Sequence, residues 1–82
     1  MSNDEVIGRI CISKCGHDRG SHYVITAIVD DKFVLVANGQ NRRLVNPKRK
    51  NIAHLSVTTG RTAATNDQAI TKGIQQFKKG VQ

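Results

Sequence analysis

The sequence predicts a mainly all-β fold, in which a small antiparallel barrel or half-open sheet is followed by a C-terminal α-helix. Short β-branched segments, turn signals between them with no intervening helix, and a change to helical spacing near the end of the chain indicate this fold. The 82 residues make one domain. We assign residues 1–60 to the barrel and residues 61–82 to a linker and the helix.

Three strands are predicted in the first half of the chain. Residues 6–13 are rich in β-branched side chains, and residues 14–21 form a polar loop with two glycines. Residues 23–29 are apolar at nearly every position, which indicates a strand with little exposure. The Asp-Asp-Lys turn at 30–32 joins this strand to one at 33–37, and so short a connection makes the two strands antiparallel neighbours.

A fourth strand is predicted at residues 52–57. Asn38-Gly39 ends the third strand, because both central positions of such a turn need positive φ. Residues 40–51 are polar and cationic, which is typical of a loop. From residue 52 the period of two returns. The residues expected to face inward are Ala53, Leu55 and Val57, and those expected to face outward are Ile52, His54 and Ser56.

The last segment has the pattern of an amphipathic helix after a linker at residues 58–65. Thr65-x-x-Gln68 can form a capping box at its start. Gly73 in its middle weakens the helix by about 1 kcal/mol relative to alanine, so the helix needs a partner surface, either the barrel or another molecule. The apolar residues at helical spacing are Ile70, Ile74, Phe77 and Val81.

The charge of the chain is strongly positive and unevenly distributed. The formal net charge is +7, which makes a polyanion the first partner to consider. No acidic residue occurs between Lys32 and Asn66, and closely spaced cations repel one another unless an anion lies among them. The alternative is a solvated loop that serves solubility alone. The cations of the densest run are Arg42, Arg43, Lys48, Arg49 and Lys50.

The loop at residues 14–21 supplies a second cationic group, formed by Lys14, His17 and Arg19. Two glycines in this loop allow backbone N–H groups to approach a phosphate, and an arginine can bind phosphate oxygens in bidentate fashion. The alternative is that the glycines serve only the turn geometry, while Asp18 pairs with Arg19 or caps the loop.

The aromatic residues favour recognition of folded RNA over stacking on unpaired bases. Tyr23, Phe33 and Phe77 all fall within apolar stripes, where core packing is the simpler interpretation. Contacts to the phosphate backbone and to RNA shape are therefore expected to dominate.

The two cysteines are expected to be reduced thiols. Cys11 and Cys15 lie roughly 13 Å apart if the segment is extended, whereas a disulfide needs about 7 Å or less. Zinc binding through both cysteines with His17 and His22 is the alternative, although tight zinc sites use closer cysteine spacing. Cys11 is expected to be a small buried apolar residue.

Enzymatic and membrane functions have little support in the sequence. No phosphate-loop or dinucleotide motif occurs, so we expect no catalysis and no cofactor. No apolar run approaches the length of a membrane span, and the acidic, polar start does not resemble a secretory signal. A cytoplasmic protein is expected.

The motifs also resemble those of a known family. Gly8-Arg9-Ile10-Cys11-Ile12-Ser13-Lys14-Cys15-Gly16-His17-Asp18-Arg19-Gly20, followed by Tyr23-Val24-Ile25 and Asp30-Asp31, resembles a KOW motif. The resemblance continues through Phe33-Val34-Leu35-Val36, Asn38-Gly39, Arg42 and Asn51-Ile52-Ala53-His54-Leu55. Over about residues 6 to 58 the chain is similar to the fourteen-e family of large-subunit ribosomal proteins. Within this similarity it resembles the bacterial relatives of the family.

This resemblance implies a Src-homology-3-like barrel that binds ribosomal RNA, as an integral ribosomal subunit or as a ribosome-associated factor in translation, and that is a monomer when free. The alternative is a protein-interaction module of the transcription or translation machinery that docks through the C-terminal helix. The residues that the resemblance places at the RNA are Lys14, His17 and Arg19 in the first loop, and Arg42, Arg43, Lys48, Arg49, Lys50 and His54 later in the chain.

Overall fold

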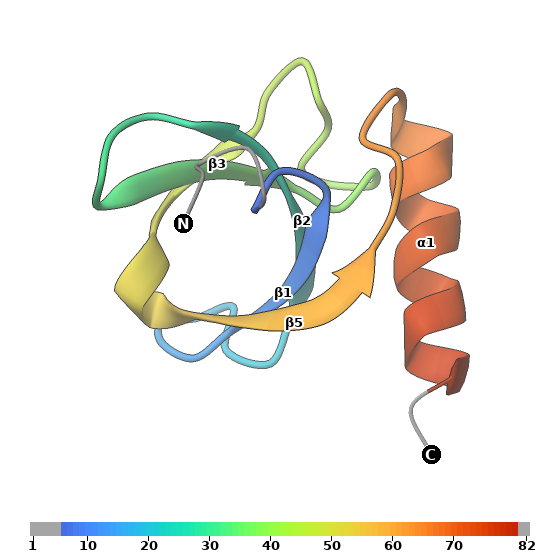
Figure 1. Cartoon of the computed structure of the whole chain (residues 1–82), viewed down its shortest axis with the longest axis horizontal. Helices are drawn as coiled ribbons and strands as arrows, with labels where there is room; N and C mark the ends of the chain where they lie inside the picture. Colours follow the sequence, from blue (N-terminus) through green and yellow to red (C-terminus); the bar gives the residue numbers. More distant parts are fainter. Residues whose placement is uncertain (1–5, 81–82) are drawn as a thin grey trace.

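The computed structural model describes residues 6–80, and these form five strands, a short 3₁₀ helix and an α-helix (Figure 1). The elements are β1 (Arg9–Ser13), β2 (His22–Ile28), β3 (Phe33–Ala37), β4 (Lys48–Asn51), η2 (Ile52–His54), β5 (Leu55–Arg61) and α1 (Asp67–Gly80). Val81, the last position of the predicted apolar stripe, lies outside the described residues.

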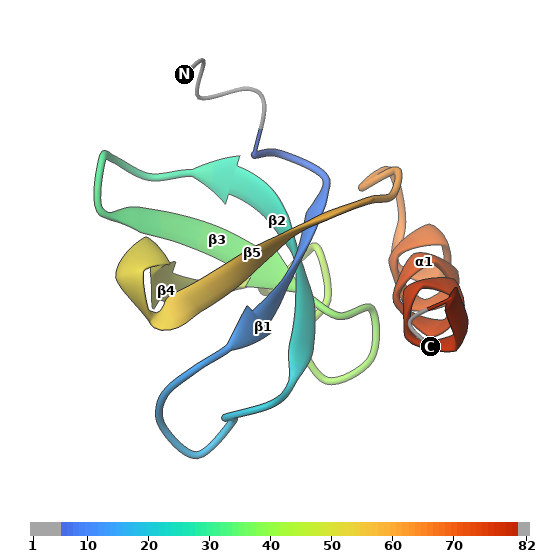
Figure 2. The same cartoon turned by 60° about the horizontal axis from the view of Figure 1, so that its bottom comes forward.

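The strands form one antiparallel sheet in the order β4-β3-β2-β1-β5, which curls into a small barrel (Figures 1 and 2). The register shifts between Arg9 and Cys11 in β1 and between Ile25 and Ala27 in β2. Such bulges bend a strand and increase its twist, which helps a five-stranded sheet to close. The predicted mainly all-β fold with a C-terminal helix is confirmed.

The second half of the sheet differs from the prediction in three ways. Residues 48–51, expected in a loop, form β4 and pair with β3, and residues 52–54 form η2 instead of the start of a strand. β5 continues to Arg61, through residues that were expected to be linker. The predicted alternation is also wrong in part, since Leu55 is buried but Ala53 and Val57 are exposed. Ala53 lies in η2, where the two-residue alternation of a strand does not apply.

The first strand is shorter than predicted, because residues 6–8 form a turn before β1. Gly8 has a φ of 87° there, and its Cβ position lies 3.0 Å from the backbone oxygen of Thr62. A glycine therefore suits both the left-handed conformation and the close approach of the two segments.

Two apolar cores share the sheet between them. Successive side chains of a strand point to opposite faces, so β1 and β2 contribute to both cores. The core inside the barrel consists of Cys11, Tyr23, Ile25, Val34, Val36 and Leu55. The core between the outer face of the barrel and α1 consists of Ile10, Val24, Ala37, Ile70 and Ile74.

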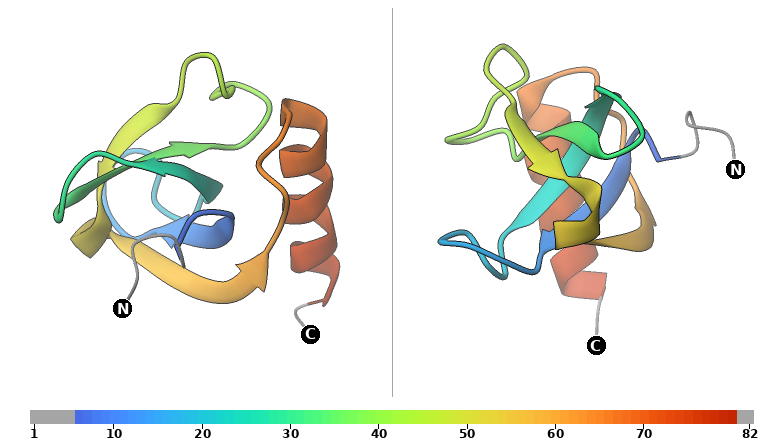
Figure 3. Two further views of the ribbon diagram at one scale, coloured as in Figure 1. Left: turned by 45° about the horizontal axis from the view of Figure 1, so that its top comes forward. Right: turned by 90° about the vertical axis from the view of Figure 1, so that its left-hand side faces the viewer.

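Helix α1 therefore packs against the barrel of its own chain, one of the two possibilities left open by the sequence (Figure 3). Asn66, and not the predicted Thr65, caps the helix, since its side-chain oxygen accepts a hydrogen bond from the backbone N–H of Ala69 at 2.7 Å. Gly73 faces Thr62, and a Cβ at this position would collide with that side chain. The glycine weakens the helix but allows it to approach the end of β5. None of the described residues forms a helix long and apolar enough to cross a membrane.

Candidate nucleic-acid interface

The two basic loops leave the barrel at the same end. Residues 14–21 connect β1 to β2, and residues 38–47 connect β3 to β4. Because β2 and β3 are antiparallel neighbours, the start of β2 lies beside the end of β3. The turn with Asp30 and Asp31, which joins β2 to β3, lies at the other end of both strands. The right-hand view of Figure 3 shows both loops projecting to one side. The fold thus separates a cationic end from an acidic turn.

Five of the predicted site residues lie in these loops. The side chains of Lys14, His17 and Arg19 are exposed, as is that of Arg43, while that of Arg42 is half-buried. Within residues 6–80 no carboxylate forms an ion pair with any of them. These basic side chains are therefore available to an external anion. The five residues are Lys14, His17, Arg19, Arg42 and Arg43.

Lys48 and Lys50 occupy a different position, because both bind the carboxylate of Asp18. The Nζ of Lys48 lies 2.9 Å from one carboxylate oxygen and the Nζ of Lys50 lies 3.0 Å from the other. Ser13 and Tyr23 donate hydroxyl hydrogen bonds to the same carboxylate, each at 2.9 Å. The ion pairs of Asp18 are therefore with these two lysines and not with Arg19, the partner that the alternative interpretation of the loop considered. Asp18 instead joins the first loop to β4.

The surroundings of Asp18 keep it ionised. Burial alone raises the pKa of this carboxyl, but hydrogen bonds from Lys48, Lys50, Tyr23 and Ser13 outweigh burial and hold the pKa well below its ordinary value. Burial, followed by the hydrogen bond to Asp18, raises the pKa of Tyr23 to about 12. At neutral pH the cluster therefore contains a carboxylate and a neutral phenol, in contact with Lys48 and Lys50.

Arg49 points away from this cluster. It lies between the two lysines on β4, so the alternation of the strand turns it to the opposite face. Its guanidinium carbon lies 4.1 Å from the centre of the Phe33 ring, which is a cation–π contact. Phe33 is half-buried, and the arginine covers one face of its ring.

His54 lies near the base of the first loop. Its side chain is exposed on η2, and its backbone carbonyl accepts a hydrogen bond from the N–H of Lys14 at 2.8 Å. The structure therefore brings His54 to the first loop, although 40 positions separate the two residues in the sequence. No local sequence signal indicates this contact.

The cysteines lie apart in the fold. Cys11 is fully buried in the barrel core, as expected, whereas Cys15 is exposed in the first loop, and both are free thiols. Burial, only partly offset by the charge of Lys50, raises the pKa of Cys11 to about 12. Among residues 6–80, no three His, Cys, Asp or Glu side chains come together in a way that could hold a metal ion.

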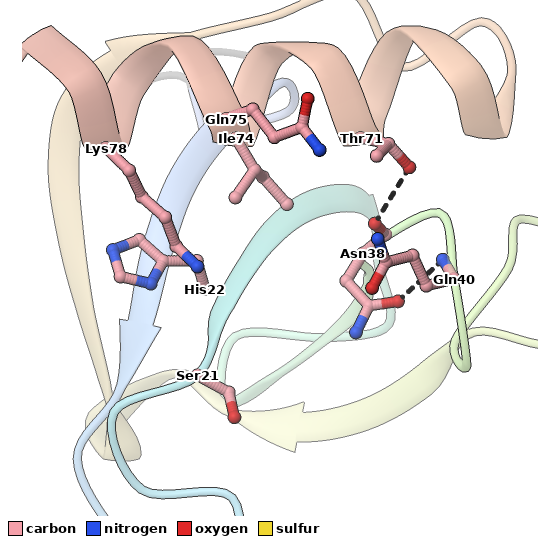
Figure 4. A pocket seen from close by; sticks show the side chains of 8 residues that line it. All are labelled: Ser21, His22, Asn38, Gln40, Thr71, Ile74, Gln75 and Lys78. Atoms are coloured by element: carbon pink, nitrogen blue, oxygen red, sulfur yellow. Dashed lines mark hydrogen bonds between the residues drawn. The ribbon is translucent and has the colours of Figure 1, made fainter.

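One feature that the sequence did not indicate is a polar groove between α1 and the strand ends (Figure 4). His22, Gln40 and Gln75 line it, from β2, the second basic loop and the helix respectively. These residues belong to three separate segments, and none stands in a recognisable motif.

The chain is similar to ribosomal proteins of known name. The large ribosomal subunit protein eL14 of Saccharolobus islandicus (strain L.S.2.15 / Lassen #1) is 36% identical over 73 residues, which cover 85% of this chain and 76% of that protein. The eL14 protein of Saccharolobus solfataricus is 34% identical over 73 residues, with the same coverage. The eL14 protein of Metallosphaera sedula is 42% identical over 52 residues, covering 63% of this chain and 54% of that protein. No protein-family model matches the chain. The identity and coverage of these relatives show that the chain belongs to the eL14 family of large ribosomal subunit proteins.

Proposed function

We propose that this protein is a non-enzymatic RNA-binding protein of the large ribosomal subunit, and that its basic loops contact the backbone of ribosomal RNA. Its relatives are large ribosomal subunit proteins by name. The observation that carries the proposal is the position of the two basic loops, which leave one end of the barrel together. Within the described residues, no carboxylate forms an ion pair with the basic side chains of Lys14, His17, Arg19, Arg42 or Arg43.

The backbone of the first loop also suits contact with phosphate. Gly16 and Gly20 have φ values of 84° and 89°, and beyond the two adjacent residues no atom lies within 4 Å of the Cβ position of Gly20. A phosphate can therefore approach the main chain there without displacing protein atoms. We assign direct RNA contacts to this loop, to Arg42 and Arg43, and to His54 beside it.

Lys48 and Lys50 serve the interface indirectly in this proposal. Their ion pairs with Asp18 hold the first loop against β4, so they position Lys14 and Arg19. Arg49, on the opposite face of β4, lies outside the proposed contact surface. This assignment narrows the set of RNA-binding residues that the sequence predicted.

We further infer that the protein acts in the cytoplasm, as a monomer when free and bound to the large subunit otherwise. Both apolar cores are covered by elements of the same chain, which supports a monomer. The interaction-module alternative loses its docking residues, because Ile70 and Ile74 are buried and Phe77 packs against the same core. Membership of the bacterial branch stays a prediction.

The test removes two loop cations and leaves the Asp18 cluster intact. The variant Lys14→Ala/Arg19→Ala is compared with the control Lys32→Ala/Lys72→Ala, which removes the same charge from exposed sites outside the two basic loops. Affinity for large-subunit ribosomal RNA transcribed in vitro is measured over a range of salt concentrations. Each lost phosphate contact lowers the slope of log K against log salt by roughly 0.7–0.9, so the loop variant should lose about 1.4–1.8.

Equal slopes for the two variants would remove the first loop from the RNA interface. Sedimentation of cell extract is a separate experiment, which distinguishes an integral ribosomal protein from a transient ribosome-associated factor. Migration with large subunits after a high-salt wash indicates an integral component, and release by high salt indicates a transient factor.

A further inference from the structure

The groove between α1 and the barrel opens beside both basic loops. It encloses about 230 Å³. Figure 4 shows Ser21 and His22 on one side, Gln40 on another, and Gln75 and Lys78 projecting from the helix above. Ser21 ends the first basic loop and Gln40 belongs to the second, so the opening adjoins the surface that we propose contacts RNA.

Two of the side-chain amides that line the groove form no hydrogen bond with the described part of the chain. Asn38 is occupied, since its side-chain oxygen accepts hydrogen bonds from the backbone N–H groups of Gln40 and Arg42 at 2.9 and 3.0 Å. Within residues 6–80, no hydrogen bond involves the side-chain amide of Gln40 or that of Gln75, and both side chains are exposed. Each amide offers a donor and an acceptor, which matches the edge of a nucleobase.

A flat ring and an apolar surface complete the groove. The ring of His22 lies 6.1 Å from that of Phe77, tilted by 58°, and Ile74 supplies the apolar surface. Burial and the charge of Lys78 lower the pKa of His22, against the opposing effect of its hydrogen bond to the carbonyl of Gly20. The imidazole is therefore mainly neutral at pH 7 and carries no charge that would repel a nucleobase donor group.

We propose that this groove binds one unpaired nucleobase of the RNA held by the two basic loops. The base lies between Gln40 and Gln75, and Lys78 approaches its phosphate. A nucleobase fits better than an apolar side chain of a protein partner, because seven of the eight residues that line the groove have polar side chains. This inference rests on the proposed RNA-binding function and adds a base contact that the loops do not provide.

The first experiment probes the groove directly with small ligands. Adenosine, guanosine, cytidine and uridine 5′-monophosphates are each titrated to millimolar concentration into ¹⁵N-labelled protein, and ribose 5-phosphate serves as the control. The side-chain amide signals of Gln40 and Gln75 should shift with at least one nucleotide and not with ribose 5-phosphate. No shift with any nucleotide, or equal shifts with ribose 5-phosphate, would overturn the proposal.

The second experiment compares two neighbouring glutamines on α1. Gln75→Leu removes an amide that lines the groove, whereas Gln76→Leu changes an exposed residue that does not line it. Gln75→Leu should weaken binding of large-subunit ribosomal RNA about five- to tenfold without changing the salt slope, because no phosphate contact is lost. Gln76→Leu should bind like the wild type.

The outcomes separate the two proposals. If Gln75→Leu binds RNA as tightly as Gln76→Leu, the groove does not hold a base and the loop interface stands. If the wild-type protein binds no ribosomal RNA, both proposals fall. Urea unfolding of the two variants shows whether any loss of affinity comes from loss of folded protein.

Discussion

Replacing Asp18 with asparagine tests whether the carboxylate between the first loop and β4 stabilises the barrel. Asparagine keeps the shape of the side chain and one acceptor oxygen, but it has no charge. In the wild-type protein the side chain of Asp18 is 14% exposed and that of Lys50 is 10% exposed. The substitution therefore leaves the Lys50 ammonium group largely buried without a counter-charge.

The expected loss in the free energy of unfolding follows from the solvent exposure of the two ion pairs that Asp18 forms with Lys48 and Lys50. The Lys48 side chain is 33% exposed, so water screens its pair and the contribution is small. Loss of one partner from a buried pair costs about 3–5 kcal/mol. A lysine can move part of its charge to solvent, so we expect the lower end, about 3 kcal/mol. For a domain of this size that loss lowers Tm by roughly 12–24 °C.

The difference in stability between the wild-type protein and Asp18→Asn should decrease as the pH is lowered. The ordinary pKa of the Asp18 carboxyl is 3.8, and the folded value is lower because of its four donors. Between these values the unfolded chain binds more protons than the folded chain, so stability falls as the pH falls. The contribution of the charge is complete above about pH 5. The difference between wild type and variant should therefore shrink progressively below that pH.

Urea unfolding followed by far-UV circular dichroism measures this difference at pH 7 and at pH 3. Asp31→Asn is the matched control, because it raises the net charge equally but changes an exposed turn residue at the other end of the barrel. If Asp18→Asn and Asp31→Asn unfold at the same urea concentration at pH 7, the Asp18 cluster does not stabilise the fold. A difference that is equally large at pH 3 would show that it does not arise from the charge.

Two further predictions concern the docking of α1 and the two thiols. Gly20→Ala and Gly39→Ala both place a side chain at positive φ, but only at Gly39 would the new Cβ collide with Thr71 and Asp67 of α1. In urea unfolding Gly20→Ala should cost about 1 kcal/mol and Gly39→Ala about 3 kcal/mol or more, and equal losses would contradict the close approach of the helix. Ellman's reagent should modify one thiol per native chain, the exposed Cys15, and reach Cys11 only on unfolding, because Cys11 is buried and burial raises its pKa to about 12. Modification of both thiols at the same rate would contradict the burial of Cys11.

The parts of the fold that the sequence predicts well are those in which apolar residues carry the pattern. The strand expected at 33–37 matches β3, and the one expected at 23–29 lies within one residue of β2. Ile70 and Ile74 are buried in the helix, as their spacing predicts. In each of these elements the side chains that face a core are apolar, so the spacing of apolar residues in the sequence reveals the strand or helix.

β4 could not be found in this way, because its sequence, Lys-Arg-Lys-Asn, contains no apolar residue. β4 is held beside β3 by antiparallel backbone pairing. The two of its side chains that face Asp18 are lysines. Charge neutralisation takes the place of apolar burial on that face. The same reason explains why the loop expected at 40–51 ends four residues early.

The densest run of cations in the sequence is divided by the fold into three different roles. Arg42 and Arg43 lie in the second basic loop, Lys48 and Lys50 pair with Asp18, and Arg49 covers Phe33. The repulsion expected within this run is relieved for the two lysines by a carboxylate of the same chain, 30 and 32 residues away. Local sequence cannot show such a partner. Because Asp18 belongs to the first loop, the bonds that neutralise the two lysines also hold the loop that presents Lys14 and Arg19. The proposed RNA surface therefore depends on residues that we place outside that surface.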